Sequence, residues 1–397
     1  MLKFPFPTII ILPMDKNHHN IYLDYAASTP LDPKVLEVVN ITMAQVYGNA
    51  SSIHRFGLQA KAVLDTARTT VAESLNARPD EIYFTSGGTE SNNLAMQGVA
   101  SQFSKPGNII ISAIEHPSIL QTARYLKSRG WQITLLPVNR MGQIDPEILQ
   151  QSINSATRLV SIMHVNNEIG SINNIEACAK IAYEKNILFH TDAVQSFGKL
   201  PVDLRRVPAS FLSLTGHKIY GPKGAGVLFI RRKTKLGKLF FGGSQENGRR
   251  SGTENIPAIA GLTKAVELCQ INRDADKSHL EQLGSELREL MKLQLPEARL
   301  NGGENGVPNI QNYSIPGIDN MSLLMGLDLA GIAISNGSAC SSGDVSPSHV
   351  LRALHLPDKE LKSSFRISFG RFTTSEDIKH AVRSIARFIK KKQPGRQ

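Results

Sequence analysis

Hydrophobic residues recur along the chain in two alternating patterns. Short, nearly continuous apolar runs bounded by turn residues predict buried strands, and apolar positions three to four residues apart predict amphipathic helices. The predicted strands are 81–86, 108–114, 132–138, 158–165, 187–192, 211–214 and 226–230. Helices are predicted before and between them, including 58–75, 119–129 and 175–185. Strands that alternate with helices over short connections predict an α/β fold, in which a mostly parallel sheet lies between helices.

The pattern changes near residue 261. A long helix over 256–269 is followed by a charged helix over 277–293, several short strands and a terminal helix. We therefore predict a large α/β domain over 20–262 and a smaller α+β domain over 263–397. Residues 1–19 contain an apolar run at 9–12, but three prolines and the lack of a small-residue cleavage site argue against a signal peptide. We expect residues 1–19 either to pack on the small domain or to lack order.

Composition narrows the function classes. The 397 residues are 41% hydrophobic, yet after the first thirteen no stretch holds the about 18 unbroken apolar residues of a membrane helix. The net charge of +11 comes mostly from scattered basic residues without interleaved aromatics, so we expect no nucleic-acid partner; solubility and an acidic protein partner explain the charge.

The three cysteines, Cys178, Cys269 and Cys340, form neither a disulfide framework nor a C-x-x-C pair. A reducing cytoplasm fits this pattern.

Polar residues gather at the ends of five predicted strands, where ligands bind in open α/β sheets. In chain order these are Gly88 and Thr89 at a helix start, then His116, Asn167, Asp192 and Lys218. Taken singly, each has a structural explanation as a helix cap, a strand-end histidine or a surface lysine. Together they supply a phosphate-binding helix start, an imidazole, an amide, a carboxylate and an amine. This combination predicts a binding site.

One cofactor needs this whole set. Pyridoxal 5′-phosphate requires a lysine for its aldehyde, a carboxylate for its pyridine nitrogen, donors for its phosphate and a flat partner for its ring. Longer motifs occur in order at 22–30, 84–93, 164–170, 250–255, 337–340 and 366–374. With these motifs the chain resembles, over residues 21–385, the NifS/IscS-like cysteine desulfurases of the class V aminotransferase family. The resemblance implies a fold-type I pyridoxal-phosphate transferase.

The resemblance also implies a role for each matching residue. Lys218 binds the aldehyde as a Schiff base and moves protons, Asp192 pairs with the pyridine nitrogen, and His116 stacks on the ring as a second catalytic group. The other positions are Gly88, Thr89, Thr215 and His217 for the phosphate, Thr253 for the phosphate of a second subunit, Gln195 and Asn167 for the ring oxygen and the substrate side, and Arg366 for the substrate carboxylate. Strand alternation places Arg366 on one face with Ser368, and arginine grips carboxylates through two bonds.

The sequence departs from the family pattern at two positions. Thr215 stands where serine is usual, which keeps the hydroxyl, and Ala50 replaces a proline.

The cysteines select the reaction. Cys178 and Cys269 lie in predicted amphipathic helices, where a thiol is usually a small core residue. Cys340 lies in a run of small polar residues, 335–344, which predicts an exposed loop. The resemblance therefore implies that Cys340 attacks the sulfur of L-cysteine, keeps it as a persulfide and releases L-alanine. We expect no metal site, apart from transient ligation of an Fe–S cluster by Cys340.

The resemblance implies partners as well. The sulfur is expected to pass to Fe–S cluster assembly or thio-modification through a sulfur-acceptor or scaffold protein, although the chain lacks the longer tail by which some members hold that scaffold. Thr253 implies a homodimer. Three alternatives stay open: a selenocysteine lyase, a class V aminotransferase, and a catalytically silent scaffold with the same fold. Neither of the alternative enzymes needs Cys340, and a silent scaffold would be expected to have lost Lys218, Asp192 or His116.

Overall fold

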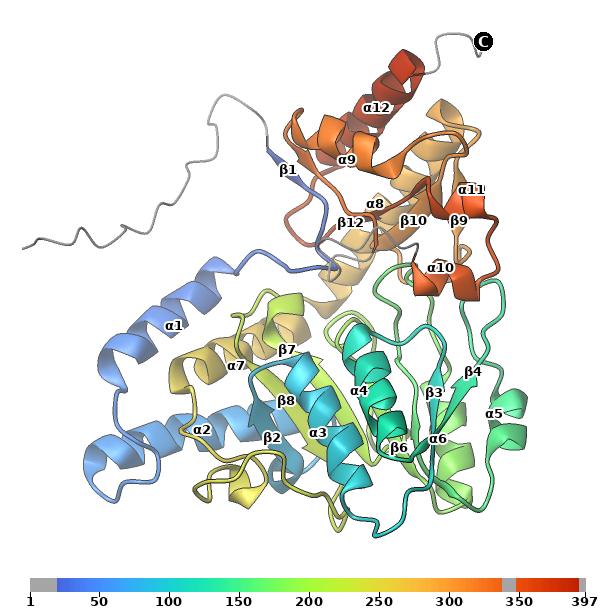
Figure 1. Ribbon diagram of the computed structural model, residues 1–397. Helices are drawn as coiled ribbons and strands as arrows, with labels where there is room; N and C mark the ends of the chain where they lie inside the picture. Colours follow the sequence, from blue (N-terminus) through green and yellow to red (C-terminus); the bar gives the residue numbers. More distant parts are fainter. Residues whose placement is uncertain (1–19, 338–347, 393–397) are drawn as a thin grey trace, which may run out of the picture.

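The computed structural model describes residues 20–337 and 348–392, and Figure 1 shows how their elements are arranged. The helices are α1 (Pro33–Gln45), α2 (Arg55–Ser74), α3 (Gly88–Ala100), α4 (Pro117–Ser128), α5 (Pro146–Ser152), α6 (Ile175–Glu184), α7 (Ile256–Ile271), α8 (Arg273–Gln294), α9 (Asn320–Asp328), α10 (His349–Ala353), α11 (Asp358–Leu361) and α12 (Ser375–Lys392). The strands are β1 (Ile21–Tyr22), β2 (Ile82–Thr85), β3 (Asn108–Ser112), β4 (Gln132–Leu136), β5 (Thr157–Ser161), β6 (Leu188–Asp192), β7 (Phe211–Thr215), β8 (Gly226–Ile230), β9 (Arg299–Asn301), β10 (Ile310–Ser314), β11 (Ile332–Ala333) and β12 (Ser364–Ser368).

Strands β2 to β8 form one seven-stranded sheet in the order β2-β8-β7-β6-β5-β3-β4. Neighbours pair in parallel, except that β8 is antiparallel to both β2 and β7. The carboxyl ends of β2, β3, β5, β6 and β7 therefore meet at one edge of the sheet. Strands β3, β7 and β8 are buried along their whole length, as strands covered on both faces should be. The predicted α/β fold with a mostly parallel sheet is confirmed.

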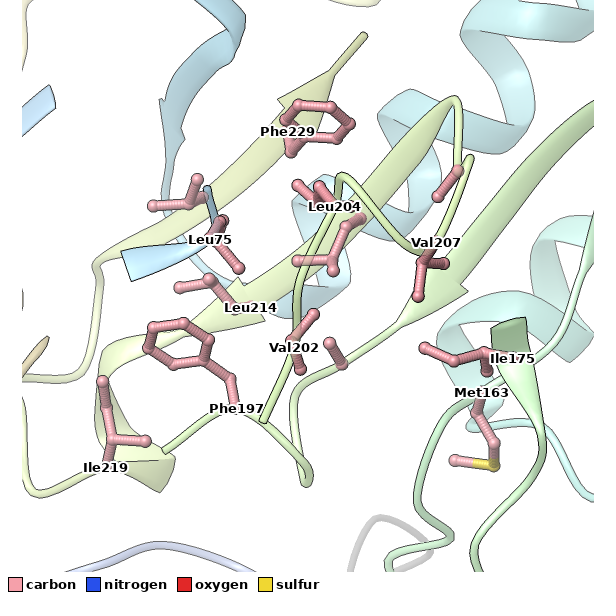
Figure 2. Close-up of a cluster of buried hydrophobic side chains, with 14 of the residues drawn as sticks. Leu75, Met163, Ile175, Phe197, Val202, Leu204, Val207, Leu214, Ile219 and Phe229 are labelled. Carbon is pink, nitrogen blue, oxygen red and sulfur yellow. The ribbon is translucent and has the colours of Figure 1, made fainter. Parts of the chain in front are cut away.

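Helices cover both faces of this sheet (Figure 1). On one face, Leu94 of α3 and Ile119 of α4 pack with Ile109 and Ile111 of β3. On the other face lie α2, α6 and α7. Figure 2 shows part of the core on this face, in which Phe197, Val202 and Leu204 gather around Leu214 of β7 and Phe229 of β8. Burial of each large apolar side chain stabilises the fold by roughly 1.5–3 kcal/mol.

The C-terminal elements build a second core around the antiparallel sheet β12-β10-β9 and helices α8, α9 and α12. The N-terminal strand belongs to this core, because β1 pairs in parallel with β11 and both Ile21 and Leu23 are buried there. The chain then crosses to the large sheet through residues 24–29. The predicted domain boundary at 262/263 falls inside α7, and the division of the chain into 20–262 and 263–397 stays a prediction.

Some boundaries differ from those predicted. The strand expected over 158–165 ends at Ser161, although Ile162 and His164 still donate backbone hydrogen bonds to β6. A turn follows, in which the Asn166 Oδ1 atom accepts hydrogen bonds from the N–H groups of Glu168 and Ile169. Helix α7 is buried on most sides instead of amphipathic, and α8 begins at Arg273, directly after α7. Within 20–337 and 348–392, no helix combines the length and apolar character that crossing a bilayer requires.

Candidate active site

Lys218 closes a short 3-10 turn, Gly216–Lys218, directly after β7. Its Nζ atom donates hydrogen bonds to the carbonyl oxygens of Ala26 at 2.5 Å and Ala27 at 2.6 Å. Both carbonyls belong to the crossing segment 24–29, nearly 200 positions earlier in the chain. The amine is therefore held at the carboxyl edge of the sheet, where the segment from the second core reaches it.

Asp192 ends the neighbouring strand β6 and is 5% exposed. Its Oδ2 atom accepts a hydrogen bond from Asn92 Nδ2 at 2.7 Å, and its Oδ1 atom accepts one from the N–H of Val194 at 2.9 Å. Asn92 was not predicted as a site residue. The available signal was its spacing, since it follows Gly88 by four residues and so lies on the same face of α3.

His116 is the N-cap of α4, with Pro117 in the first turn. The His116 Nδ1 atom accepts a hydrogen bond from the N–H of Ser118 at 3.1 Å and lies 2.8 Å from the Ser118 hydroxyl. Burial lowers the pKa of His116 below its ordinary value. The negative charge of Asp192 partly opposes this shift, whereas the positive charges of Lys218 and His349 lower the pKa further. The imidazole is thus oriented by its own helix and is neutral at pH 7. An open groove of about 580 Å³ adjoins it between α3 and α4.

The start of α3 approaches β6 and β7 very closely. Gly87 has a φ of 152°, and a Cβ atom on Gly88 would lie 2.7 Å from the Val194 side chain, so neither position suits a larger residue. The first N–H groups of a helix lack intrahelical partners and attract anions. Thr89 is exposed here, while Thr215 is buried and donates to the Ala225 carbonyl at 3.1 Å.

His217 lies beside Ser28, with its Nδ1 atom 3.3 Å from the serine hydroxyl. Burial first, and then the charges of Lys218 and Lys223, lower the pKa of His217 to about 4. The imidazole is therefore neutral at physiological pH and carries one N–H that can donate a hydrogen bond.

Arg366 reaches the same edge from the second core. It lies in the middle of β12, is 1% exposed, and donates from Nη2 to Asp24 at 2.5 Å. Its Nη1 atom donates to the carbonyl oxygens of Asn167 at 2.8 Å and Gly337 at 3.3 Å. Within the described residues the buried Nε–H of Arg366 has no hydrogen-bond partner. An unpaired buried donor is costly, which indicates a position meant for an acceptor from a ligand.

The remaining predicted residues divide into two groups. Gln195 is buried and donates to the Ala26 carbonyl at 2.8 Å, which joins it to the Lys218 contact, and the half-buried Asn167 contacts Arg366 through its carbonyl. Thr253 is exposed before α7, and in the described part of the chain it forms no hydrogen bond with the strand-end residues. Cys340 lies outside the described residues.

The two other cysteines are buried in helices α6 and α7. Burial raises the pKa of Cys178 to about 12 and that of Cys269 to about 11. Neither thiol is suited to act as a nucleophile at neutral pH, because the thiolate is the reactive form.

Sequence reasoning missed three acidic residues around the site. Asp24 pairs with Arg366 across 342 positions, so no local pattern reveals the contact. Burial raises the pKa of Glu168 to about 7 against the opposing effects of Ser348 and Arg366. Burial likewise raises the pKa of Glu115, directly before His116, to about 8. Glu168 lies in the motif 164–170 and Glu115 directly precedes the predicted His116, but burial of a charge has no sequence signature.

Comparison with known proteins agrees with this geometry. Residues 21–380 match the family described as Aminotransferase class-V. The chain belongs to this family. It is 43% identical to cysteine desulfurase IscS of Dictyoglomus turgidum, over 94% of this chain and 95% of that protein. It is 44% identical to cysteine desulfurase IscS of Serratia proteamaculans, over 93% of this chain and 92% of that protein. A solved structure described as a NifS-like protein has a TM-score of 0.88 and 34% identity, covering 93% of this chain and 99% of the other.

Class-V aminotransferases depend on pyridoxal 5′-phosphate, and the described residues fit this cofactor. The edge of the sheet offers the amine of Lys218, the fixed carboxylate of Asp192 and a glycine-lined helix start. The buried Nε–H of Arg366 adds a hydrogen-bond donor that no described residue uses. The resemblance to cysteine desulfurases that the motifs indicated is confirmed.

Proposed function

We propose that this chain is a cysteine desulfurase, which removes the sulfur of L-cysteine, releases L-alanine and holds the sulfur as a persulfide on Cys340. One observation carries the proposal: Arg366 comes from the second core to the edge that bears Lys218 and Asp192. An amino acid therefore finds partners for its carboxylate and its amino group in one site. Similarity to cysteine desulfurases over more than nine tenths of the chain favours this reaction over others of the family.

Pyridoxal 5′-phosphate, when bound, supplies an electron sink that labilises bonds at Cα and Cβ of the substrate. Lys218 would hold its aldehyde, Asp192 its ring nitrogen and His116 its ring face. The other proposed contacts are Gly88, Thr89, Thr215 and His217 to the phosphate, and Gln195 and Asn167 to the ring oxygen and substrate side.

The chain's own residues would bind the substrate carboxylate and transfer protons. Arg366 binds the α-carboxylate through its free Nε–H, and Asp24 keeps the guanidinium in place. Lys218 would move protons between the substrate carbons through Nζ, because its amine is held at the strand end where cofactor and substrate are proposed to bind. His116, which is neutral at pH 7, is a second proton acceptor.

Cys340 completes the reaction. Its thiolate attacks the sulfur of L-cysteine, so that an S–S bond forms, the C–S bond breaks, and the electron pair with a proton stays on the carbon. L-cysteine and the thiol thus give L-alanine and the persulfide without an external oxidant or reductant. The buried thiols of Cys178 and Cys269 do not take part.

The test compares three cysteine variants of the holoenzyme with labelled L-cysteine. We expect Cys340→Ala to bind the cofactor normally, yet to form almost no alanine and no protein-bound persulfide. Cys178→Ala and Cys269→Ala are the matched controls and should turn over nearly as the parent does. Near-parental alanine formation by Cys340→Ala would move the assignment to a selenocysteine lyase or an aminotransferase.

We further propose a homodimer in which Thr253 reaches the phosphate of the partner's cofactor. Its exposed position supports this, as do large exposed apolar side chains nearby in the chain and around α1 and α2: Tyr47 is 72% exposed, Ile53 is 94% exposed and Phe241 is 86% exposed. Sedimentation at assay concentration should show a dimer, and Thr253→Ala should weaken cofactor binding. A fully active monomer contradicts the proposal.

The sulfur requires an acceptor, for which we propose a sulfur-acceptor or Fe–S scaffold protein in a reducing cytoplasm. The free thiols of Cys178 and Cys269 are compatible with that compartment. The acceptor is identified by loading Cys340 with labelled sulfur, adding cell extract and locating the label. Label that leaves only as free sulfide would show that no protein acceptor is used.

A further inference from the structure

Lys199 lies at the end of the turn that follows β6 and has no part in the proposed mechanism. Its Nζ atom donates hydrogen bonds to the Gln195 carbonyl oxygen at 3.0 Å and to the Gln195 Oε1 atom at 3.3 Å. A lysine ammonium group only donates hydrogen bonds, so both contacts run from Lys199 to Gln195. Lys199 therefore holds the backbone and the side chain of one residue of the proposed cofactor site.

The amide of Gln195 is held at both of its ends. Its Oε1 atom accepts from Lys199, and its Nε2 atom donates to the Ala26 carbonyl oxygen at 2.8 Å. A flipped amide would turn its N–H groups toward the lysine donor and its oxygen toward the Ala26 carbonyl, and neither pair forms a hydrogen bond. Gln195 is 3% exposed, so bulk water does not replace a lost partner. The two partners thus fix which way the amide points.

The donor end of this amide faces the Schiff-base lysine of the proposed site. The Ala26 carbonyl that accepts from Gln195 also accepts from the Lys218 Nζ atom at 2.5 Å. In pyridoxal 5′-phosphate the ring oxygen is attached to the carbon next to the one that bears the aldehyde. A donor beside the Lys218 amine is therefore beside that oxygen when Lys218 holds the aldehyde. Nε2 carries two N–H groups, and Ala26 accepts from one of them.

Stability alone does not account for a lysine at this position. Burial lowers the pKa of Lys199 to about 8, and no described carboxylate offsets this effect. A small cavity of about 20 Å³ adjoins the side chain, and its lining includes Phe197, Val202 and Val266. An unbranched apolar side chain such as methionine suits these surroundings without the cost of burying a charge. What the lysine adds is the pair of hydrogen bonds to Gln195.

We propose that Lys199 is a positioning residue for cofactor binding, which fixes the Gln195 amide so that Nε2 faces the Lys218 amine and the ring oxygen of pyridoxal 5′-phosphate. The inference rests on the proposed function, in which Gln195 contacts that oxygen. Lys199 acts only through Gln195. Without the lysine donor the buried Oε1 atom loses its partner, and the amide is no longer held in one orientation.

The experiment titrates the apoprotein with pyridoxal 5′-phosphate and records the visible absorption of the bound cofactor. Lys199→Met should weaken binding by about fivefold, the effect of one hydrogen bond. It should also shift the absorption in the same direction as Gln195→Leu, because both variants disturb the N–H at the ring oxygen. Lys199→Arg keeps a donor and should bind within about twofold of the parent. Parental affinity and absorption in Lys199→Met overturn the proposal.

The matched control is Lys185→Met. It removes a lysine hydrogen bond to a backbone carbonyl, that of Gln150 at 3.3 Å, at the end of α6. This variant should bind the cofactor as the parent does. A loss equal to that of Lys199→Met would show that any such lysine contact matters, and it would contradict the role of Lys199.

A double-mutant cycle separates positioning of the amide from general damage to the turn. In the Gln195→Leu background, Lys199→Met should cause no further loss of cofactor affinity, because the group that it holds is already absent. Additive losses contradict the proposal, and so does parental binding by Gln195→Leu. If Lys199→Met fails to fold, Lys199→Ala gives the same comparison without added apolar surface. If Cys340→Ala is inactive while Lys199→Met binds as the parent does, this inference fails and the proposed function stands.

Discussion

The carboxyl edge of the large sheet and strand β12 of the second core reach the same site by different routes. Asp192 and Lys218 stand at or just after strand ends, and the Asp192 carboxylate is fixed by an N–H only two residues away. Arg366 lies in the middle of β12, and its partners Asp24, Asn167 and Gly337 are 342, 199 and 29 positions away. In the cofactor half of the proposed site, Lys218 and Asp192, strand ends place each residue in the chain, and distant segments only add contacts to them. The substrate half, Arg366 with its partners, exists only where distant segments meet.

The largest effect is expected from Lys218→Ala, which breaks the cofactor half. Turnover should fall by roughly a thousandfold or more, and the visible absorption of the bound cofactor should change, because the amine is removed from its place at the strand end. Alanine formation and absorption spectra test this. Lys223→Ala, at an exposed position five residues on, should retain both. A bond between cofactor and Lys218→Ala that borohydride can still reduce would refute the assignment.

Arg366→Lys tests the substrate half. Lysine keeps the charge but lacks the planar group that bonds to Asp24, Asn167 and the substrate at once, so KM for L-cysteine should rise by roughly tenfold to a hundredfold with a smaller change in kcat. Steady-state kinetics measure the changes in KM and kcat separately. Arg299→Lys, whose exposed side chain pairs with the buried Glu360 far from this site, is the control and should leave KM unchanged. An unchanged KM in Arg366→Lys would show that the substrate carboxylate binds elsewhere.

Asn92→Ala sharpens the comparison, because its contact with Asp192 lies within the cofactor half yet crosses 100 positions. Loss of one hydrogen bond to a carboxylate should weaken cofactor binding by about fivefold to tenfold. Cofactor titration of the apoprotein measures it. Gln97→Ala removes a similar amide bond one turn further along α3, to Asn93, and should have little effect. Equal losses in the two variants would show that general damage to α3, and not the Asp192 contact, is the cause.

Glu115→Gln should have the smallest effect on activity and a clear effect on stability. Burial raises the pKa of Glu115 from 4.5 to about 8, so the folded protein keeps a proton that the unfolded chain loses. This residue's contribution to stability therefore falls as pH rises from 4.5 to about 8 and is constant above that range. The variant should gain about 1 kcal/mol or more relative to the parent across this range. Urea unfolding at several pH values, with exposed Glu147→Gln as control, tests it; a pH-independent difference contradicts it.

Much of the large sheet was predictable because the signals are local. Each of its strands is a short apolar run, and Pro117 marks the helix start after His116. Residue types at strand ends indicated a cofactor site before any contact was known. The role of Asp24 and the burial of Glu168 could not be read in this way, since their partners lie far away in the chain.

By itself, the sequence determined the alternation of strands and helices, the order of the strand-end residues and the chemical groups that they carry. It could do so because apolar periodicity and turn residues act over a few neighbouring positions. Tertiary structure alone decided that β1 joins β11, that the segment after it carries the Ala26 and Ala27 carbonyls to Lys218, and that Arg366 points to the same edge. The physical reason is that these contacts join residues about 200 to more than 300 positions apart, and they form only when two hydrophobic cores have been assembled against each other.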